Sequence, residues 1–350
     1  MNKIIVFRVD SSCQIATGHV MRCLTLAKYL KKYQIEIVFI CRDLEGNVIE
    51  RIEKEGFNLR ILTKPNVKLS VSENEYDNWF EVTWYQDASE TEEILSELKE
   101  DITLIIDHYS IDYKWHKSIR PFVKKIVVID DLANRKHDCD IVIDQNLYHD
   151  FQNRYNDLVS DNCQKFLGND YAILREQFYQ ISKRDRNNVR NILIFFGGID
   201  PDNLTLKAIN SVILAQQSLN VGFNVIVIGA KNNFQAEVMQ LCTESTFEYK
   251  LFVDNMAEIM NWADLSIGAG GTTSWERCHL NLPAIVISFA DNQIEICNAL
   301  ADYGMIKYLG NSKDITEEII MHNLIDVYND FDFEMISSSS KLNELIEAII

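Results

Sequence analysis

The sequence has little proline and no stripe of basic residues, and each scarcity excludes a class of protein. Only four of its 350 residues are proline and 47% are hydrophobic, a composition typical of a well-packed globular chain and not of a disordered one. The formal net charge is −18 at pH 7, which argues against a general affinity for nucleic acid or for an anionic membrane surface. An anionic small molecule would therefore need local attraction, such as backbone N–H groups at the start of a helix.

Paired cysteines and long apolar runs are also missing. The eight cysteines are never spaced as Cys-x-x-Cys, so the sequence suggests neither a zinc site nor a disulfide framework. Cys23, Cys41 and Cys297 lie in apolar or helical surroundings, which favour buried, reduced thiols. No apolar run is long enough to span a bilayer, and the segment Met1–Val9 resembles a strand and not a signal peptide. We therefore expect a cytoplasmic protein.

Short apolar runs alternate with segments of helical period along most of the chain. This alternation is typical of buried parallel strands joined by crossover helices, and 350 residues exceed one ordinary core. The predicted class is α/β, with two doubly wound, Rossmann-like domains facing each other across a substrate cleft. The expected strands are Ile4–Val9, Ile35–Ile40, Leu59–Leu62, Thr103–Ile106, Ile126–Ile129, Ile141–Ile143, Asn191–Phe196, Phe223–Ile228, Tyr249–Val253, Leu265–Ile267 and Ala284–Ile287.

A polar, charged segment over residues 183–190 separates the two halves and marks the boundary between domains. We expect the first domain at 1–167, a linker at 168–189 and the second domain, with the C-terminal helices, at 190–350. Because a cleft between two domains of one chain needs no partner subunit, we expect a monomer.

Two segments are less regular. Residues 63–90 match neither the strand nor the helix pattern, and we predict an irregular insertion there. After Ile315, two helical patterns flank the serine run Ser337–Ser340, and we expect the last helix to pack back on a domain.

A glycine-rich turn opens the second half. Gly197 and Gly198 follow a predicted strand, and Pro201 then precedes a helix. Two glycines let the backbone approach a phosphate closely, and the following helix start would add a favourable field. A tight turn that needs positive φ is the alternative explanation.

A second turn of this kind combines glycines with hydroxyls. Gly270, Gly271 and Thr272 follow another predicted strand of the same half and open a helix. Their amides and hydroxyls could bind a diphosphate, and Glu276, about one turn into the helix, could accept both hydroxyls of a ribose. The alternative for Glu276 is a carboxylate that only complements the helix dipole.

The most informative stretch follows the first strand. His19, directly after Gly18, falls at the start of the first helix, where the dipole favours a neutral ring that can accept a proton at pH 7. Asp10 could orient this ring or contact substrate, and Arg22, one turn further on, could face a carboxylate or a phosphate. A histidine that only caps the helix is the alternative.

Further polar residues lie at predicted strand ends, where ligands bind in open α/β sheets. Tyr109 could bond a sugar hydroxyl or acetamido group, or could be a rim aromatic without that duty. Asn146 follows a later strand in the same way. Asp130 and Asp131 form an acidic pair without further ligands, so we predict no metal site.

The second domain contributes a pair of amides. Asn292 and Gln293 follow the strand that ends near Phe289 and would face the same cleft. Neutral amides there suit recognition of uncharged sugar substituents.

Taken together, these motifs resemble one family, the UDP-2,4-diacetamido-2,4,6-trideoxy-β-L-altropyranose hydrolases of pseudaminic acid biosynthesis. They occur in the family's order over about residues 3 to 310. The motifs are Arg8-x-Asp10, Gly18-His19-x-x-Arg22-Cys23, Asp107-His108-Tyr109, Asp130-Asp131-Leu132-Ala133, His137-Asp138-Cys139-Asp140, Asp144-Gln145-Asn146, Gly168-x-x-Tyr171-Ala172-x-Leu174-Arg175, Gly197-Gly198, Gly270-Gly271-Thr272 with Glu276, and Asn292-Gln293.

The resemblance implies a GT-B-like fold, as in the lipid II N-acetylglucosaminyltransferase, with water in place of the acceptor. It implies inverting hydrolysis of the UDP-sugar to UDP and the free diacetamido sugar, with His19 as general base, Tyr109 and Asn292 at the sugar, and no metal or other cofactor. The UDP-sugar is the only partner implied. The other substrate-binding residues we expect are Asp10, Gly18, Arg22, Asn146, Gly197, Gly198, Gly270, Gly271, Thr272, Glu276 and Gln293.

One residue departs from the family pattern, and two other functions stay open. Ala16 stands where the family usually has glycine, and its methyl group could shift the loop before His19 or narrow the approach of water. A glycosyltransferase of the same architecture would need an acceptor groove. A non-catalytic sugar-nucleotide sensor would bind without turnover.

Overall fold

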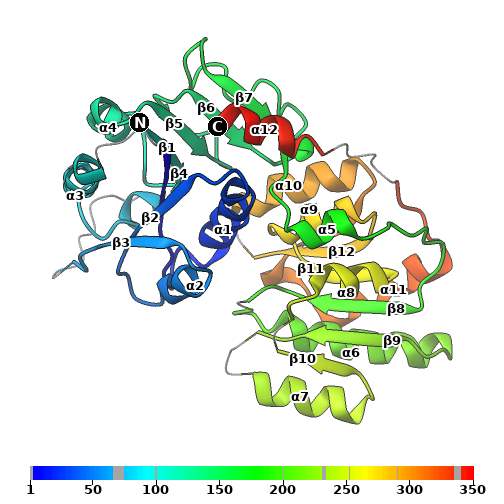
Figure 1. The fold of residues 1–350 in the computed structure, drawn as a ribbon. Coiled ribbons are helices and arrows are strands. Elements are labelled where there is room, and N and C mark those ends of the chain that lie inside the picture. Colours follow the sequence, from blue (N-terminus) through cyan, green and yellow to red (C-terminus); the bar gives the residue numbers. More distant parts are fainter. Residues whose placement is uncertain are drawn as a thin grey trace. The chain divides into compact units, whose positions relative to one another are not determined.

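The computed structural model describes residues 3–65, 75–98, 101–198, 200–230, 234–251, 253–289, 291–334 and 340–350. It forms two compact units, each with its own parallel sheet and helices (Figure 1). The N-terminal unit comprises Met1–Asn146, Asp150–Ile173 and Ser339–Ile350, and the C-terminal unit comprises Leu147–His149 and Leu174–Ser338.

The N-terminal unit has a seven-stranded parallel sheet in the order β3-β2-β1-β4-β5-β6-β7. The chain order reverses at β1, which pairs with β2 on one side and β4 on the other. The strands are β1 (Lys3–Val9), β2 (Glu36–Arg42), β3 (Asn58–Leu62), β4 (Asp101–Asp107), β5 (Lys125–Ile129), β6 (Ile141–Asp144) and β7 (Gln164–Leu167). The helices are α1 (Gly18–Lys31), α2 (Ile49–Lys54), α3 (Trp84–Leu98), α4 (Tyr113–Ile119) and α12 (Leu342–Ile349), with 3-10 turns η1 (Glu75–Asn78), η2 (Arg120–Phe122) and η3 (Asn169–Tyr171).

The C-terminal unit repeats the design with a six-stranded parallel sheet in the order β10-β9-β8-β11-β12-β13. Here the order reverses at β8, between β9 and β11. The strands are β8 (Asn191–Phe195), β9 (Asn224–Ile228), β10 (Glu248–Lys250), β11 (Leu265–Ala269), β12 (Ala284–Ser288) and β13 (Ile306–Asn311). The helices are α5 (Glu176–Gln180), α6 (Leu204–Leu219), α7 (Gln235–Glu244), α8 (Met256–Trp262), α9 (Thr273–His279), α10 (Asp291–Asp302) and α11 (Glu317–Asn329), with the 3-10 turn η4 (Ser312–Asp314).

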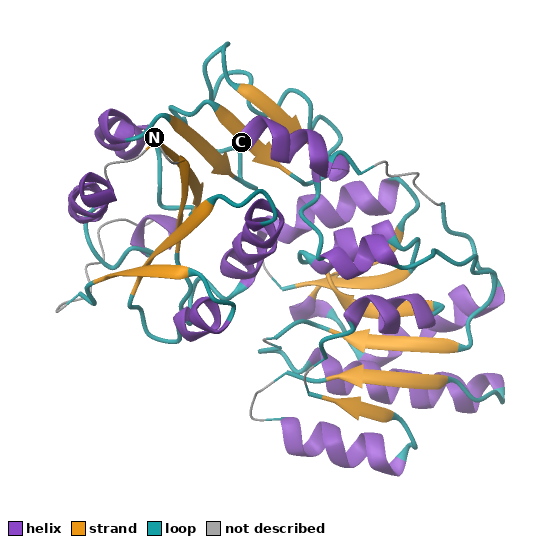
Figure 2. Cartoon of the chain, viewed as in Figure 1, coloured by secondary structure: helices purple, strands orange, loops and turns teal. Residues whose placement is uncertain are grey.

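Burial on both faces of each sheet holds the strands in place, since helices flank the strands in both units (Figure 2). In β1, Ile5, Val6 and Phe7 are fully buried although successive side chains point to opposite faces. Each such side chain contributes roughly 1.5–3 kcal/mol to stability. The sheets therefore fix the positions of the strand ends, and ligands of open α/β sheets bind beyond those ends where the chain order reverses.

The predicted α/β class and the two parallel sheets are confirmed, as are the eleven expected strands within a few residues at their ends. Two edge strands were not expected, β7 and β13. Their sequences, QKFL and IKYLGN, mix polar with apolar residues, contain no long apolar run and are only partly buried. The apolar-run criterion detects strands covered on both faces and misses these edges.

Two sequence predictions are wrong in part. Within residues 63–90, η1 and the start of α3 are regular, while 66–74 lie outside the described residues. The amphipathic period of α3 is masked because Trp84 is exposed and Asp87 is fully buried. The expected second domain includes α12, but this helix lies in the N-terminal unit. Most of the serine run, Ser337–Ser339, lies outside the described residues.

Candidate functional site

The predicted base is paired with a carboxylate. His19 is the second residue of α1, and its Nδ1 lies 2.6 Å from Oδ1 of Asp107, the last residue of β4. Val9 and Asp107 are partners in the β1–β4 register, which brings the strand ends together. When Nδ1 donates to the carboxylate, Nε2 carries the lone pair, and among the described residues Nε2 of His19 has no hydrogen-bond partner. The ring can therefore accept a proton at Nε2.

Asp107 is held ionised by its surroundings. Burial alone would raise its pKa, but the Arg22 guanidinium and the His19 ring lower it well below the usual range. A negative carboxylate fixes the ring orientation and stabilises the imidazolium that forms on proton uptake. From the sequence, Asp107 was recognised only within the motif Asp107-His108-Tyr109 and was given no role.

The first of the two alternatives for Asp10 is wrong, because Asp107 and not Asp10 orients His19. The second, a contact of Asp10 with substrate, stays a prediction. The Asp10 carboxylate accepts from Arg8 (2.6 and 2.8 Å) and from the backbone N–H of Arg42 (2.7 Å), and it lies 3.1 Å from Nε2 of His108. Burial opposes ionisation of Asp10, but Arg8 and His108 outweigh it and lower the pKa. The side chain is fully buried and ties β1 to β2.

Arg22 faces carboxylates, one of the two predicted possibilities, and both belong to the protein. Its guanidinium makes four hydrogen bonds of 2.9 Å, two to Asp107 and two to Asp131. Such bidentate pairs fix geometry as well as charge. Arg22 thus connects the His19–Asp107 pair at the end of β4 with the loop after β5. A contact between Arg22 and a ligand stays a prediction.

Tyr109 and Asn146 converge on the same carboxylate. The Tyr109 hydroxyl donates to Asp131 at 2.6 Å, and Nδ2 of Asn146 donates to Asp131 and to Asp144 at 2.8 Å each. Tyr109 also lies edge-on to His19, with ring centroids 4.6 Å apart. His19 and Arg22, predicted at the start of the first helix, and Tyr109 and Asn146, predicted at strand ends, therefore form one connected cluster. Their roles at a substrate stay predictions.

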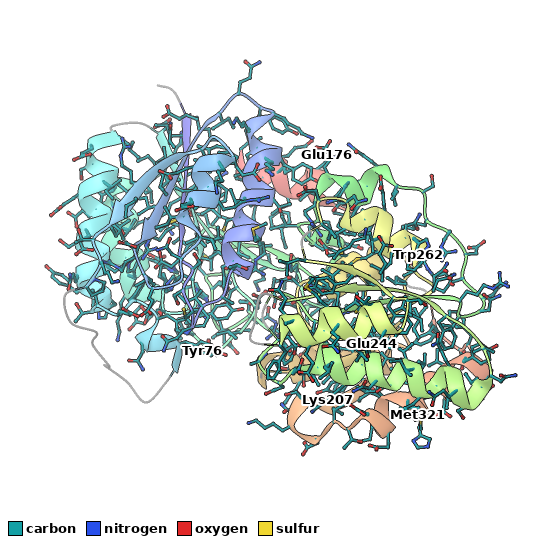
Figure 3. All side chains as sticks on the ribbon, turned by 90° about the horizontal axis from the view of Figure 1, so that it is seen from below. Tyr76, Glu176, Lys207, Glu244, Trp262 and Met321 are labelled. Atoms are coloured by element: carbon teal, nitrogen blue, oxygen red, sulfur yellow. The ribbon has the colours of Figure 1, made fainter. Side chains whose placement is uncertain are left out.

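Sequence reasoning missed an aromatic wall around the base. Trp79 stacks on Tyr109 at 5.1 Å and meets His19 at 5.7 Å, while Tyr76 of η1, labelled in Figure 3, contacts both Trp79 and Tyr109. Trp79 is only 6% exposed. Both residues come from the segment predicted as irregular, and its aromatic content was the one signal available.

The loop before His19 has an unusual backbone. Ala16 adopts φ 61°, the left-handed region in which glycine is unstrained. Its N–H donates to the Ser12 carbonyl at 2.9 Å. A Cβ added at Gly18 would meet no atom within 4 Å, so that position borders open space. The family's usual glycine at position 16 thus matches the conformation found here.

In the C-terminal unit, the first glycine turn follows β8. Gly197 has φ 96°, and a Cβ at Gly197 or Gly198 would meet nothing within 4 Å. The helix start does not add the predicted help. Asp200 accepts from the N–H groups of Leu204 (2.9 Å) and Thr205 (2.8 Å), so a protein carboxylate already caps α6.

The second glycine turn follows β11, and its two glycines have different surroundings. A Cβ on Gly270 would lie 2.2 Å from Sγ of Cys297 in α10, so this glycine is needed for packing. Gly271 borders open space, and Thr272 precedes α9 as its N-cap residue. Cys23, Cys41 and Cys297 are buried free thiols, as predicted.

Glu276 is buried, and only one of its oxygens has a partner. Oε1 accepts from Arg175 at 2.8–2.9 Å, whereas Oε2 has no hydrogen-bond partner. Burial raises the pKa of Glu276, with Arg175 opposing the shift. An unpaired buried acceptor costs about 1–3 kcal/mol, a cost that a hydroxyl donor would remove. This fits the predicted ribose contact better than a mere complement to the helix dipole.

The amide pair is only half described. Asn292 is in α10, but its side chain lies outside the described residues. Gln293 accepts from the N–H of Phe289 at 2.9 Å, and its Cβ lies 3.9 Å from a Cβ built on Gly270. Gln293 thus stands beside the second glycine turn.

Two further findings concern the described part of the chain. There, no group of three or more His, Cys, Asp or Glu side chains is arranged to hold a metal ion. Nor is any described helix long and apolar enough to cross a membrane.

The two parallel sheets, each with its strand order reversing at a central strand, define a GT-B-like α/β protein. Acinetobacter baumannii MurG matches with a TM-score of 0.68 at 13% identity, covering 100% of this chain and 99% of that chain. Neisseria meningitidis UDP-GlcNAc 2-epimerase, solved with UDP-GlcNAc, gives 0.58 at 14%, covering 100% and 99%. Residues 193–346 match the glycosyltransferase family 28 C-terminal domain.

Proteins that are similar in sequence relate this chain to a smaller group within the GT-B-like proteins. The UDP-2,4-diacetamido-2,4,6-trideoxy-β-L-altropyranose hydrolase of Campylobacter jejuni is 29% identical over 305 residues, which are 86% of this chain and 97% of the relative. The Bacillus subtilis spore coat polysaccharide biosynthesis protein SpsG is 23% identical, covering 92% and 88%. An uncharacterized Methanocaldococcus jannaschii protein is 30% identical over 81% of this chain, which spans 55% of that protein's length. The resemblance to the hydrolase is confirmed.

Proposed function

We propose that this chain hydrolyses UDP-2,4-diacetamido-2,4,6-trideoxy-β-L-altrose to UDP and the free diacetamido sugar, with inversion, in the cytoplasm as a step of pseudaminic acid biosynthesis. The observation that carries the proposal is the His19–Asp107 pair, in which Nδ1 is held at 2.6 Å and Nε2 has no partner among the described residues. The name of the Campylobacter relative supports the choice of substrate.

The proposed reaction gives each predicted residue one task. Nε2 of His19 takes a proton from water, whose oxygen attacks the anomeric carbon while the bond from that carbon to the UDP oxygen breaks. Asp107 and Arg22 hold the base, and Tyr109 and Asn292 line the sugar. The electron pair leaves with UDP, whose diphosphate takes hydrogen bonds from the backbone N–H groups of Gly271 and Thr272, while the Gly270 N–H donates to the Ile287 carbonyl at 3.2 Å. The His19 imidazolium then returns its proton to solvent.

The nucleotide part is assigned to the C-terminal unit. There Gly197, Gly198 and Gly271 border open space, and Oε2 of Glu276 lacks a donor. We propose that Glu276 accepts the ribose hydroxyls and that Gln293, beside Gly270, helps to place the sugar. The active form is a monomer.

The test is UDP release in water without an acceptor, by the wild-type protein and by His19→Ala. We expect loss of about 100-fold or more in kcat for the variant, the size of a missing general base. His322→Ala is the control, because His322 is an exposed residue of α11. Intact substrate with the wild-type protein would remove the hydrolase proposal.

A glycosyltransferase is the second candidate, and the match of residues 193–346 to a glycosyltransferase C-terminal domain favours it. It predicts UDP release only after a sugar or lipid-linked acceptor is added. Tight binding of the UDP-sugar with no turnover under either condition would instead indicate a sensor.

A further inference from the structure

Arg277 of α9 carries a buried positive charge that forms no ion pair with a carboxylate in the described part of the chain. The residue is 2% exposed, and among the described residues it takes part in no ion pair. The neighbouring Glu276 is paired with Arg175 instead, and Nε of Arg277 has no hydrogen-bond partner. Burying a guanidinium without a counter-charge is costly. Such a charge is retained where something else compensates it.

The guanidinium lies at the base of both glycine turns. Its Nη2 donates to the Ala269 carbonyl at 2.7 Å and to Ser274 Oγ at 3.0 Å, which bracket the second turn. Its Nη1 would lie 3.1 Å from a Cβ built on Gly268. Gly268 pairs in register with Phe195, the last residue of β8 before the first turn. Side chains of a helix point back toward its N-terminus, which places this charge near the turns.

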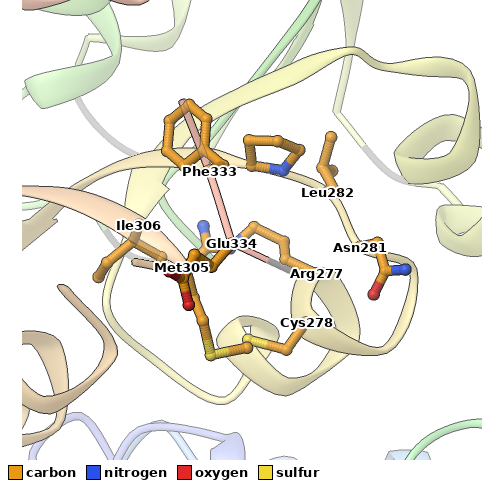
Figure 4. A pocket seen from close by; sticks show the side chains of 9 residues that line it. Arg277, Cys278, Asn281, Leu282, Met305, Ile306, Phe333 and Glu334 are labelled. Atoms are coloured by element: carbon orange, nitrogen blue, oxygen red, sulfur yellow. The ribbon is translucent and has the colours of Figure 1, made fainter. Parts of the chain in front are cut away.

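The pocket beside Arg277 adds no ion pair among the described residues. Arg277 lines a pocket together with Met305, Phe333 and Glu334 (Figure 4). Glu334 is exposed and forms no ion pair with it. Burial lowers the pKa of Arg277 from its ordinary value, and the nearby Cys278, Cys297 and Glu276 oppose this shift only in part.

We infer that Arg277 supplies the positive potential that draws the diphosphate of a nucleotide to the two glycine turns, acting through its field and not by contact. The inference rests on the proposed function for the site but adds a residue outside every motif. It also explains how a chain of net charge −18 binds an anion, because a buried charge is screened little by solvent. Arg277 is thus a positioning residue of the second turn and the source of its field.

A ligand series of falling charge tests the field. We would measure Kd for UDP, UMP and uridine with the wild-type chain, Arg277→Gln and Arg277→Lys. Arg277→Gln should weaken UDP binding about tenfold or more, weaken UMP binding less, and change uridine binding by less than about twofold. Arg277→Lys keeps the charge and should preserve the order of affinities.

Arg186→Gln is the matched control. Arg186, which precedes β8 in the chain, is also a buried arginine of this unit. Its guanidinium donates to backbone carbonyls, among them those of Ala263 (2.8 Å) and Leu280 (2.7 Å). Its loss should lower Tm without changing the ratio of UDP to uridine affinity. If Arg277→Gln does not fold, Arg277→Met replaces it. If neither variant folds, Arg277→Lys decides: loss of the order of affinities for UDP, UMP and uridine in this variant would contradict the inference.

The outcomes separate the two proposals. If the wild-type chain binds none of the three ligands, the nucleotide site of the proposed function is wrong. If it binds them and Arg277→Gln weakens UDP and uridine equally, or neither, Arg277 only packs the turn and the inference is wrong while the nucleotide site stands.

Discussion

At the scale of single residues, the site is a network of charges that hold one another. The carboxylate of Asp107 is hydrogen-bonded to both His19 and Arg22. Arg22 also donates to Asp131, which accepts a further hydrogen bond from the Tyr109 hydroxyl. Each carboxylate is ionised because arginines outweigh its burial. Under the proposed function, the reactivity of His19 therefore depends on the carboxylate of Asp107 and on Arg22, which keeps that carboxylate ionised.

Asp107→Asn tests this dependence. The amide keeps the shape of the carboxylate but removes the charge that fixes the ring and stabilises the imidazolium, so kcat should fall about 100-fold or more. Steady-state UDP release measures it. Asp112→Asn is the control, because Asp112 only caps α4. Unchanged kcat in Asp107→Asn would show that the pair is structural.

Ala16→Gly tests the strained loop. A left-handed residue with a Cβ costs about 1–2 kcal/mol, and Ala16 has φ 61°. Glycine should raise the free energy of unfolding by about 1 kcal/mol in urea titrations, part of the relief being offset by the greater freedom of the unfolded chain. A loss of stability would mean that the methyl group packs favourably.

At the scale of elements, apolar runs and strand ends predicted most of the fold and part of the site. The central strands are buried on both faces, so their sequence alone reveals them, and residues just past their ends, such as His19 and Tyr109, could be grouped. The partners within the group could not be predicted. Asp107 and His19 are 88 positions apart, and no sequence period reports which carboxylate meets the ring.

Other misses have equally local causes. The edge strands β7 and β13 lack continuous apolar runs. The carboxylate of Asp200 accepts a hydrogen bond from the N–H of Leu204, four residues further on. It therefore caps the start of α6, where the glycine pattern had predicted a phosphate. The burial of Asp87 follows from its ion pairs with Arg8 and Arg42, which are far from it in sequence.

The last helix should stabilise the unit on which it packs. Leu345 of α12 is fully buried in the N-terminal unit, and Lys125 donates to the carbonyl of Ala348 at 2.6 Å. Leu345→Ala should lower the free energy of unfolding by about 2–5 kcal/mol, measured by urea titration. Glu347→Ala, at an exposed position of the same helix, should change it little. Equal effects would mean that α12 does not pack as described.

At the scale of the whole molecule, the chain has a net charge of −18, and the buried carboxyl group of Asp144 resists ionisation. Burial, then repulsion from Asp131, raises the pKa of Asp144 from 3.8 to about 7, although Arg154 opposes the shift. Between these values the folded chain binds more protons than the unfolded chain. This group's contribution to stability is thus fully present below about pH 4 and lost as pH rises through about 7.

Asp144→Asn removes that titration. The free energy of unfolding of the variant, relative to the wild-type chain, should therefore increase from pH 5 to pH 8 in urea titrations, whatever constant offset the loss of the Arg154–Asp144 ion pair adds. Asp157→Asn, at an exposed position, should show no such slope. A difference that is flat or falls with pH would contradict the raised pKa of Asp144.

The central claim concerns both the bond broken and the face attacked. A time course by ¹H NMR, with the wild-type chain and UDP-2,4-diacetamido-2,4,6-trideoxy-β-L-altrose in water without an acceptor, follows both at once. The account predicts UDP and free sugar in equal amounts, with the inverted anomer appearing first. Substrate that stays intact, or a retained anomer as the first product, would contradict it.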